Sequence, residues 1–271
     1  MYKNQTLLIT GGTGTFGSNF VRSIVKSKTI NFKKIIIFSR DELKQLEMSQ
    51  TFTENEKSKL RFFIGDIRDK DRLKFALNNV DIIVHAAALK QVPTAEYNPM
   101  EVIKTNVIGT QNLIDTSLEK DIKKFIFLST DKACAPLNLY GATKLCSEKL
   151  VTSANDVKGK KDTIFTVVRY GNVMSSRGSV IPEFVKQSKT GILKITDKDM
   201  TRFNITVDES IDLVFWAMKY AIGSEIFIPK IPSYKITDLA RAISPKSKIK
   251  IIGIRPGEKI HEEMISSSDS Q

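Results

Sequence analysis

A cluster of acid, base and phenol side chains follows one apolar segment of this 271-residue chain. The segment reads "LSTDKACAPLNLYGATK" over residues 128–144, with Asp131 next to Lys132 and Tyr140 four residues before Lys144. Positions i and i+4 lie on one face of a helix, so the phenol and the second amine can act together. A carboxyl group, two amines and a phenol in so short a stretch indicate proton transfer as the chemistry of this site.

Parallel β-strands that alternate with helices place this cluster at a sheet edge. Short β-branched runs alternate with amphipathic stretches, which is typical of βαβ units whose strands are covered on both faces. We expect strands at residues 6–10, 34–39, 60–66, 81–88, 124–130 and 164–170, and helices at 15–28, 41–53, 70–78, 99–119 and 138–157. Open α/β sheets bind ligands at the carboxyl ends of their strands. Because Asp131 and Lys132 follow the fifth strand, a catalytic pair is favoured over a helix-capping Asp beside a solvated Lys.

The strand–helix rhythm changes after residue 170. The predicted fold is α/β: a Rossmann-type doubly wound parallel sheet over residues 1–170, which part of 204–223 rejoins, with a smaller interleaved α/β substrate lobe over 171–271. The later part is expected to hold a loop followed by a helix, and then strands on either side of a second helix, at residues 171–187, 225–233, 236–243 and 248–254.

A glycine-rich loop connects the first expected strand to the first expected helix. Its sequence "TGGTGTFG" places Gly11, Gly14 and Gly17 at a G-x-x-G-x-x-G spacing. Glycine permits a tight turn and lets backbone N–H groups approach a pyrophosphate at the helix N-terminus. In this strand–loop–helix context the pattern predicts a dinucleotide site rather than a simple tight turn. Beyond these glycines, we expect the dinucleotide to contact Thr13, Thr15, Phe16, Asp66, Ile67, Ala86, Ala87, Ala88, Lys90, Asn106, Tyr140 and Lys144.

The end of the second expected strand favours NADP over NAD as the cofactor. NAD sites usually carry an Asp or Glu there for the ribose 2′-hydroxyl, whereas a nearby Arg accommodates the 2′-phosphate of NADP. This chain reads "IFSRDELK", so Ser39 and Arg40 stand at the strand end, and Asp41 and Lys44 lie at the start of the next helix. We expect all four residues at the cofactor, and Asp41 also suits the helix dipole.

Several blocks, in order along nearly the whole chain, resemble one known family. They read "FSRDELKQLEM", "RFFIGDIRDK", "AAALKQVPTAEYNP", "LSTDKA", "NLYGATKL", "VVRYGNV" and "IRPGEK". With the glycine loop and the Tyr140-x-x-x-Lys144 pair, they resemble the extended short-chain dehydrogenase/reductases and, more narrowly, the inverting UDP-N-acetylglucosamine 4,6-dehydratases of pseudaminic acid biosynthesis. This chain has Gln91 where members usually have His, and members usually extend further past the last block. The smaller lobe is therefore expected to be incomplete at its C-terminal end.

The resemblance implies an NADP-dependent removal of water from UDP-N-acetylglucosamine after oxidation at C4, which makes the C5 proton acidic. It implies that Tyr140 takes the C4 hydroxyl proton, helped by Lys144, whose cation lowers the phenol's pKa, and that Thr130 hydrogen-bonds the same C4 hydroxyl. Lys132 removes the C5 proton and returns one to the opposite face, which inverts C5. Asp131 protonates the departing C6 hydroxyl.

The resemblance also implies contacts to the sugar nucleotide. The residues expected there are Lys90, Asn172, Val180, Arg202, Arg255 and Glu258. Asn172 matches a substrate-contacting Asn of the family, whereas Arg255 can bind the diphosphate or pair with Glu258 instead. The expected partners are UDP-N-acetylglucosamine and further copies of the chain, in a dimer or a hexamer.

Three other functions stay open at this point. A UDP-N-acetylhexosamine 4-epimerase shares the cofactor loop and the Tyr–Lys pair, and a related dehydratase that feeds N-acetyl-L-fucosamine synthesis shares almost every block. A catalytically silent NADP-binding regulator is a third possibility. Retaining nucleotide-sugar dehydratases usually have Asp-Glu where this chain has Asp131-Lys132, and simple 4-epimerases have no such pair. This dyad therefore favours the inverting dehydratase.

Composition excludes several other classes of protein. The net charge is +12, but Lys and Arg are mixed with Asp and Glu along the chain, so we expect no nucleic acid partner. No apolar run approaches the roughly 20 residues of a membrane span, and the start "MYKNQTLLITGG" is too short an apolar segment for a signal peptide, so we expect a cytoplasmic protein without membrane contact. Two cysteines (134, 146) and two scattered histidines (85, 261) predict neither a disulfide framework nor a metal site.

Overall fold

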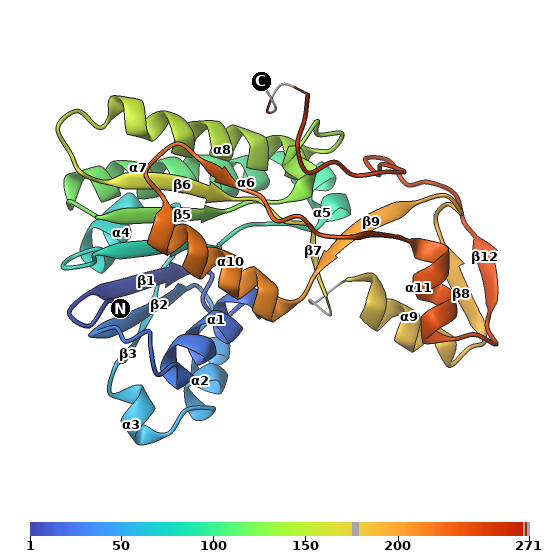
Figure 1. Ribbon diagram of the computed structural model, residues 1–271, viewed down its shortest axis with the longest axis horizontal. Coiled ribbons are helices and arrows are strands. Elements are labelled where there is room, and N and C mark those ends of the chain that lie inside the picture. The colour runs from blue at the N-terminus through green and yellow to red at the C-terminus, as the bar shows by residue number, and fades with distance from the viewer. Residues whose placement is uncertain (175–178, 268, 270–271) are drawn as a thin grey trace.

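A seven-stranded parallel sheet forms the larger body of the molecule (Figure 1). The computed structural model describes residues 1–174, 179–267 and 269. The strand order is β10-β6-β5-β4-β1-β2-β3, and every neighbouring pair is parallel. This is the order of a Rossmann-type doubly wound sheet, so the predicted fold class is confirmed. The strands are β1 (Thr6–Thr10), β2 (Lys34–Ser39), β3 (Leu60–Ile64), β4 (Ile82–His85), β5 (Lys124–Leu128), β6 (Ile164–Val168) and β10 (Ile226–Phe227).

Two helical layers cover the sheet because both faces of its strands are apolar. Successive strand residues point to opposite faces, so Leu7 and Ile9 enter one buried cluster and Leu8 enters the other. The first layer consists of α1 (Thr15–Lys26), α2 (Glu42–Gln50) and α10 (Val207–Tyr220). The second consists of α4 (Lys70–Ala76), α7 (Gly109–Glu119) and α8 (Leu139–Val157).

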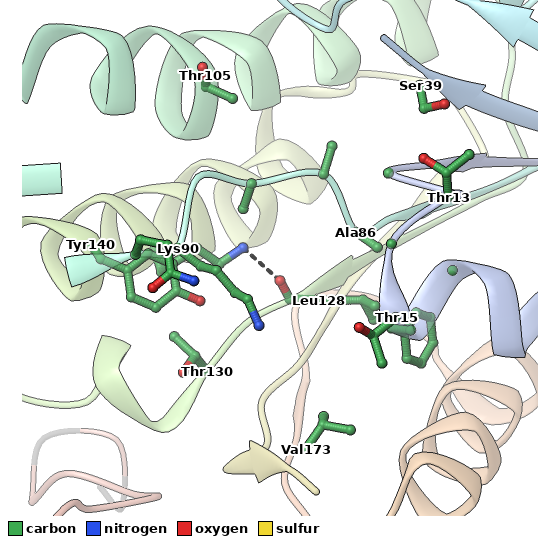
Figure 2. A pocket seen from close by; sticks show the side chains of 18 of the residues that line it. Thr13, Thr15, Ser39, Ala86, Lys90, Thr105, Leu128, Thr130, Tyr140 and Val173 are labelled. Atoms are coloured by element: carbon green, nitrogen blue, oxygen red, sulfur yellow. Dashed lines mark hydrogen bonds between the residues drawn. The ribbon is translucent and has the colours of Figure 1, made fainter. Parts of the chain in front are cut away.

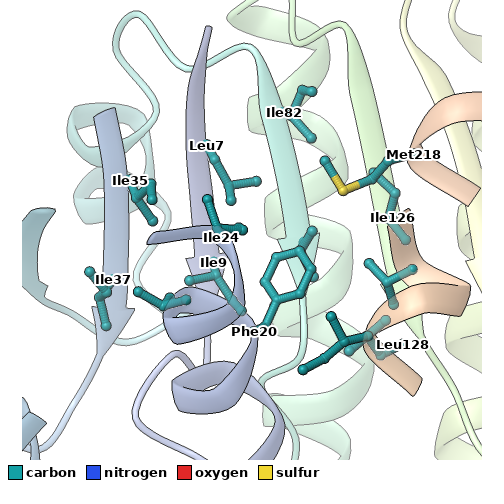
Figure 3. Packing of buried hydrophobic residues seen from close by; sticks show 14 of the residues in the cluster. Leu7, Ile9, Phe20, Ile24, Ile35, Ile37, Ile82, Ile126, Leu128 and Met218 are labelled. Carbon is teal, nitrogen blue, oxygen red and sulfur yellow. The ribbon is translucent and has the colours of Figure 1, made fainter. Parts of the chain in front are cut away.

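The first cluster joins segments from both ends of the chain. Figure 3 shows Phe20 of α1 among Ile9, Ile126 and Leu128 of the strands, with Met218 of α10 packed beside them. The Phe20 ring also packs at a tilt against Phe215 of α10, with 5.0 Å between the ring centroids. Because α10 and β10 come from the second half of the chain, that half returns to the larger body. The exact domain division at residue 170 stays a prediction.

A smaller lobe projects from the larger body at the right of Figure 1. One small sheet has the order β11-β9-β7, and a second pairs β12 with β8. Six buried side chains from these elements form its own cluster, namely Phe184, Leu193, Ile195, Met200, Ile236 and Ala240. Its elements are β7 (Asn172–Val173), α9 (Val180–Ser188), β8 (Ile192–Ile195), β9 (Thr201–Ile205), β11 (Ser233–Lys235), α11 (Ile236–Ile243) and β12 (Lys248–Ile251). Within the loop and helix expected over 171–187, residues 175–178 lie outside the described residues.

The single helix expected over 99–119 is interrupted. It consists of α6 (Pro99–Ile103), a π-helical turn (Lys104–Ile108) and α7, and a short α5 (Val92–Tyr97) precedes it. In the wide turn the Asn106 carbonyl accepts hydrogen bonds from the hydroxyls of Thr110 (2.5 Å) and Ser147 (2.8 Å). These side chains compete with the helical N–H for that carbonyl, which explains why the helix widens here.

The remaining regular elements are a one-turn α3 (Glu54–Lys57) and a short 3₁₀ turn at Asp131–Ala133. The 3₁₀ turn lies directly after β5, at the carboxyl edge of the large sheet. Among the helices that the structure describes, none is both long and apolar enough to cross a bilayer.

Candidate active site

A cavity of about 660 Å³ lies along the carboxyl ends of the large-sheet strands. Figure 2 shows Thr13, Thr15 and Ser39 at one end of it and Lys90, Thr130 and Tyr140 at the other. Ligands of doubly wound sheets bind in this place. Its lining includes most of the predicted cofactor residues, namely Gly11, Thr13, Gly14, Thr15, Phe16, Gly17, Ser39, Arg40, Asp41, Lys44, Asp66, Ile67, Ala86, Ala87, Ala88, Lys90, Tyr140 and Lys144.

The glycine loop fits a dinucleotide diphosphate. Gly11 has a φ of +64°, and a Cβ there would lie 2.9 Å from the backbone of Ala87. Gly14 is the N-cap of α1 and has no side chain to accept a hydrogen bond from the first turn. The first N–H groups of this 12-residue helix are thus free of a side-chain cap beside the cavity, where they can bind phosphate oxygens.

At the end of the cavity where the cofactor is expected, Arg40 lies near two carboxylates that already pair with other cations. Asp41 caps α2 by accepting a hydrogen bond from Lys44 N (3.0 Å), and its carboxylate lies 2.6 Å from Lys44 Nζ. Hydrogen bonding to Lys44 lowers the pKa of Asp41. Arg68 Nη2 lies 2.7 Å from Asp66 Oδ2, whereas Arg40 is 3.7 Å from the same oxygen. Arg40 is therefore the more weakly held cation in this group.

The 3₁₀ turn after β5 forms a tight polar cluster. Thr130 Oγ1 donates to Asp131 Oδ1 at 2.9 Å, and Lys132 Nζ lies 3.0 Å from the same oxygen. Lys132 Nζ also donates to Asn172 Oδ1 at 3.1 Å. The Asp131 side chain is fully buried, and its Oδ2 has no hydrogen-bond partner among the described residues. Thr130, Lys132 and Asn172 line the cavity, and Asp131 lies behind them.

The phenol and the amine of α8 reach the same end of the cavity. Lys144 Nζ donates to Leu128 O at 2.6 Å, a bond drawn in Figure 2, and stands 3.8 Å over the Phe127 ring. Burial lowers the pKa of Lys144 to about 7, although Glu148 opposes the shift. Burial and the nearby Asp131 carboxylate raise the pKa of Tyr140, opposed by a hydrogen bond with Thr130. This direction is opposite to the expected lowering, because burial disfavours the charged phenolate and the Asp131 charge adds to that effect.

Glycine at the start of α8 brings that helix against the 3₁₀ turn. Asn138 caps α8 by accepting a hydrogen bond from Gly141 N at 2.8 Å. A Cβ on Gly141 would lie only 2.2 Å from the Lys132 carbonyl oxygen. Only a residue without a side chain allows this approach. The close approach places Tyr140 and Lys132 in one cavity.

Six predicted site residues are not part of the described lining, and one of them is Asp131, which lies behind it. Asn106 instead holds the loop after β4, since its side-chain amide bonds Leu89 N and O at 2.8 and 2.9 Å. Arg202 donates to the carbonyls of Thr201, Lys259 and Ile260 at 2.7 to 3.1 Å. The others lie at the start of α9 or in the exposed segment beyond β12, namely Val180, Arg255 and Glu258.

Several lining residues were missed from the sequence. Their positions directly after β5 and β6 could have identified three of them, because those strand ends face the ligand. Thr105 had no such signal, since the π-helical turn brings it to the cavity, where its buried hydroxyl has no hydrogen-bond partner among the described residues. The missed residues are Phe38, Gly65, Gln91, Val92, Pro93, Thr105, Leu128, Ser129, Tyr170, Gly171, Val173 and Ser179.

Comparisons with known proteins give a consistent picture. The chain is 56% identical over 272 residues to a Campylobacter jejuni protein named UDP-N-acetylglucosamine 4,6-dehydratase (inverting), which covers all of this chain and 80% of that protein. It is 45% identical to a Rickettsia typhi protein named UDP-glucose 4-epimerase, over 99% of this chain and 80% of the relative.

The solved structures agree on the fold. The structure of Pen from Bacillus thuringiensis superimposes with a TM-score of 0.92 at 42% identity, covering 97% of this chain and 84% of Pen. A dTDP-glucose 4,6-dehydratase from Streptomyces venezuelae, DesIV, has a TM-score of 0.83 at 22% identity, which supports the fold. A family model described as "Polysaccharide biosynthesis protein" matches residues 7–271. The chain therefore belongs to the polysaccharide biosynthesis protein family of extended short-chain dehydrogenase/reductases.

Proposed function

We propose that this protein is an inverting UDP-N-acetylglucosamine 4,6-dehydratase, a hydro-lyase that works with a bound nicotinamide cofactor. The observation that carries the proposal is the Asp131–Lys132 pair, whose carboxylate and amine lie 3.0 Å apart in the same site as Tyr140. A 4-epimerase needs the phenol but has no use for this second pair. The 56% identity to a protein of that name supports the same choice.

The side chains divide the proton transfers among them. The cofactor, when bound, supplies hydride chemistry at C4 and C6 of the sugar. Tyr140 takes the C4 hydroxyl proton, with Thr130 in hydrogen-bond reach of the phenol. The resulting C4 carbonyl acidifies C5, Lys132 takes the C5 proton, and Asp131 protonates the departing C6 hydroxyl. General acids and bases of this kind each contribute about 10²- to 10⁴-fold.

The Asp131–Lys132 pair can hold its single shared proton in two ways. In the ion-pair form the proton is on the amine, and in the neutral form it is on the carboxyl group. Moving the proton across the 3.0 Å gap between Lys132 Nζ and Asp131 Oδ1 changes no net charge. The neutral form is the one that has a free base for C5 and an acid for the C6 hydroxyl.

We further propose NADP as the cofactor. Arg40 lines the cavity and is about half-exposed, and its one ion pair among the described residues is the long contact to Asp66, so it is available to a 2′-phosphate. Asp41, the carboxylate that could serve a 2′-hydroxyl, already binds Lys44. Binding of NADP and NAD measured side by side tests this choice, and tighter binding of NAD would contradict it.

The name of the Rickettsia relatives makes a UDP-sugar 4-epimerase the second candidate. Incubation with UDP-N-acetylglucosamine in deuterated water, followed by product NMR, separates the two. The dehydratase gives a 4-keto-6-deoxy sugar of L-arabino configuration with deuterium at C5. An epimerase gives only UDP-N-acetylgalactosamine with protium at C5, and further epimerisation at C3 would identify the dehydratase of N-acetyl-L-fucosamine synthesis.

The placement of the sugar nucleotide follows from these roles. Lys90 and Asn172 line the catalytic end and are the proposed sugar contacts. Burial and the neighbouring Lys132 cation lower the pKa of Lys90, and an anionic ligand beside it would favour the charged amine again. Assembly as a dimer or hexamer remains a prediction, which light scattering of the purified protein checks.

A further inference from the structure

A second buried carboxylate, that of Glu262, approaches the catalytic amine from outside the cavity. Glu262 Oε1 lies 3.9 Å from Lys132 Nζ, and the Glu262 side chain is only 4% exposed. Its other oxygen, Oε2, has no hydrogen-bond partner among the described residues. Glu262 lies far along the chain from the catalytic motif, in a segment without regular structure, and nothing in the proposed mechanism so far uses it.

The segment that carries Glu262 is fastened on both sides. On the N-terminal side, Lys259 Nζ donates to Cys134 O at 2.7 Å, beside the 3₁₀ turn, and Thr201 N donates to Ile260 O at 3.0 Å. On the C-terminal side, the buried Arg169 donates to Met264 O at 2.9 Å. In Figure 1 this dark red segment runs from the smaller lobe back toward the larger body. The position of the carboxylate is therefore fixed relative to Lys132.

The proton balance of the reaction gives this position a purpose. When Lys132 takes the C5 proton it becomes an ammonium, and at that moment Asp131 still carries the proton meant for the C6 hydroxyl. Asp131 is then neutral and cannot balance the new charge. Glu262 is the other carboxylate within 4 Å of the amine among the described residues.

We propose that Glu262 is a positioning residue that holds the Lys132 amine and stabilises its ammonium form during removal of the C5 proton. This inference rests on the proposed function. Lys259 Nζ, 3.8 Å from Glu262 Oε2, competes for the same carboxylate and moderates its effect. Among the described residues, the charged or titratable groups near the Asp131–Lys132 pair are Lys90, Tyr140, Tyr234, Glu262 and, beside Glu262, Lys259.

The test compares Glu262→Gln with Glu263→Gln, which removes an exposed charge one residue further along. An opposite charge at this distance favours an amine's charged form by about 1 to 3 pKa units, and Lys259 weakens the effect here, so Glu262→Gln should slow turnover about tenfold. The acidic limb of the pH profile of kcat should also move down by about one pH unit, because the Lys132 ammonium loses its proton more readily without the Glu262 charge. KM should stay unchanged, since Glu262 does not line the described cavity.

Two further variants keep the inference testable if the Gln variant folds poorly. Glu262→Asp keeps the charge and should leave the acidic limb near its native pH. Lys259→Met removes the competing cation, so the limb should move up instead of down. A purely structural role would lower the rate in all three variants without moving the limb in opposite directions, and that result would overturn the proposal.

A second readout separates this inference from the function itself. Reaction of the Lys132 amine with acetic anhydride, followed by peptide mass spectrometry across pH, needs no turnover. The half-reaction pH should fall in Glu262→Gln and stay at its native value in Glu263→Gln. If the protein releases no water from UDP-N-acetylglucosamine but this shift is seen, the proposed function fails and the Glu262–Lys132 coupling stands. Turnover without any shift refutes the role of Glu262 alone.

Discussion

The larger body and the smaller lobe differ in the interactions that stabilise each of them. Two extensive clusters of fully buried aliphatic and aromatic side chains line the two faces of the seven-stranded sheet. The smaller lobe has a cluster of only six buried side chains. It is joined to the C-terminal segment by guanidinium-to-carbonyl bonds, in which Arg202 binds the carbonyls of Lys259 and Ile260.

The proposed catalytic groups lie where these two regions meet. Tyr140, Lys144 and the 3₁₀ turn are anchored to the large sheet, whereas Asn172 and Glu262 come from the second half of the chain. Exposing buried hydrophobic surface costs more free energy than losing a solvent-accessible polar contact, so the large sheet is harder to loosen than the smaller lobe. The step at C4 uses groups on the large sheet, whereas the proton transfer at C5 also uses groups from the second half of the chain. We therefore expect the step at C4 to tolerate loosening of the smaller lobe better.

The largest expected effect is that of Lys132→Ala. Without this base the release of water and the uptake of deuterium at C5 should fall at least about 10²- to 10⁴-fold. In the proposed mechanism oxidation at C4 needs Tyr140 and not Lys132, so the near-ultraviolet absorbance of reduced nicotinamide should still develop. Lys104→Ala, an exposed lysine paired with Glu101, is the matched control and should keep full activity. Simultaneous loss of both signals would mean that Lys132 supports the fold rather than the chemistry.

Phe184→Ala tests whether the smaller lobe unfolds by itself. Truncation of a buried Phe costs about 3 to 5 kcal/mol, which is a large share of what a six-residue cluster can supply. Hydrogen exchange should accelerate over α9, β8 and α11 while β1, β4 and β5 stay protected, and dinucleotide binding should persist. Phe125→Ala, in the second cluster of the large sheet, should lower the unfolding temperature of the whole molecule instead. If hydrogen exchange accelerated equally in the smaller lobe and the large sheet in both variants, the two regions would not unfold separately.

Lys144→Met tests how much the burial of the Lys144 amine lowers the free energy of unfolding. Burial lowers the pKa of Lys144 to about 7 from an ordinary 10.5, so the unfolded chain binds this proton more tightly than the folded one. The resulting destabilisation is complete below about pH 7 and vanishes above about pH 10.5. At pH 6, without ligand, the variant should therefore be more stable than the native chain. The gain should be a few kcal/mol, because each pKa unit corresponds to about 1.36 kcal/mol. Urea unfolding at pH 6 and pH 10 measures this, and a gain independent of pH would refute the cause.

Arg40→Ser should have the smallest effect, confined to the cofactor half. Loss of a charge-assisted contact of about 1.5 to 3 kcal/mol would weaken NADP binding roughly ten- to a hundredfold. NAD binding should change little because its 2′-hydroxyl carries no charge. Calorimetric titration with both dinucleotides measures the ratio. Arg61→Ser, on the neighbouring strand, serves as the control, and an equal loss for both cofactors would place Arg40 away from the 2′-position.

The sequence predicted the large sheet well for a physical reason. Strands such as β1 and β5 are short continuous apolar runs, and the glycine loop and the α8 motif follow them directly. Local patterns of this kind identify elements that are buried on both faces. The predicted helix over 236–243 has those bounds in the structure. By contrast, the π-helical turn depends on Thr110 and Ser147 bonding to one carbonyl, and no local pattern reveals such a contact.

The same difference explains what was missed in the site. The residues grouped around Tyr140 and Lys132 follow one another in the chain, so their spacing revealed them. Glu262 lies 130 positions after Lys132 and reaches it through an irregular segment held by side-chain-to-carbonyl bonds. Long-range polar contacts of this kind leave no periodic trace in a sequence.

The missing side chain at residue 141 has a consequence for how such enzymes can diverge. A methyl group there would collide with the carbonyl of Lys132, and α8 would have to retreat from the turn. The Tyr140 phenol and the Lys132 amine, the proposed groups for the first and the second step, would then move apart by about the width of that methyl. One added carbon atom could thus uncouple alcohol oxidation from elimination while leaving every reactive group in place.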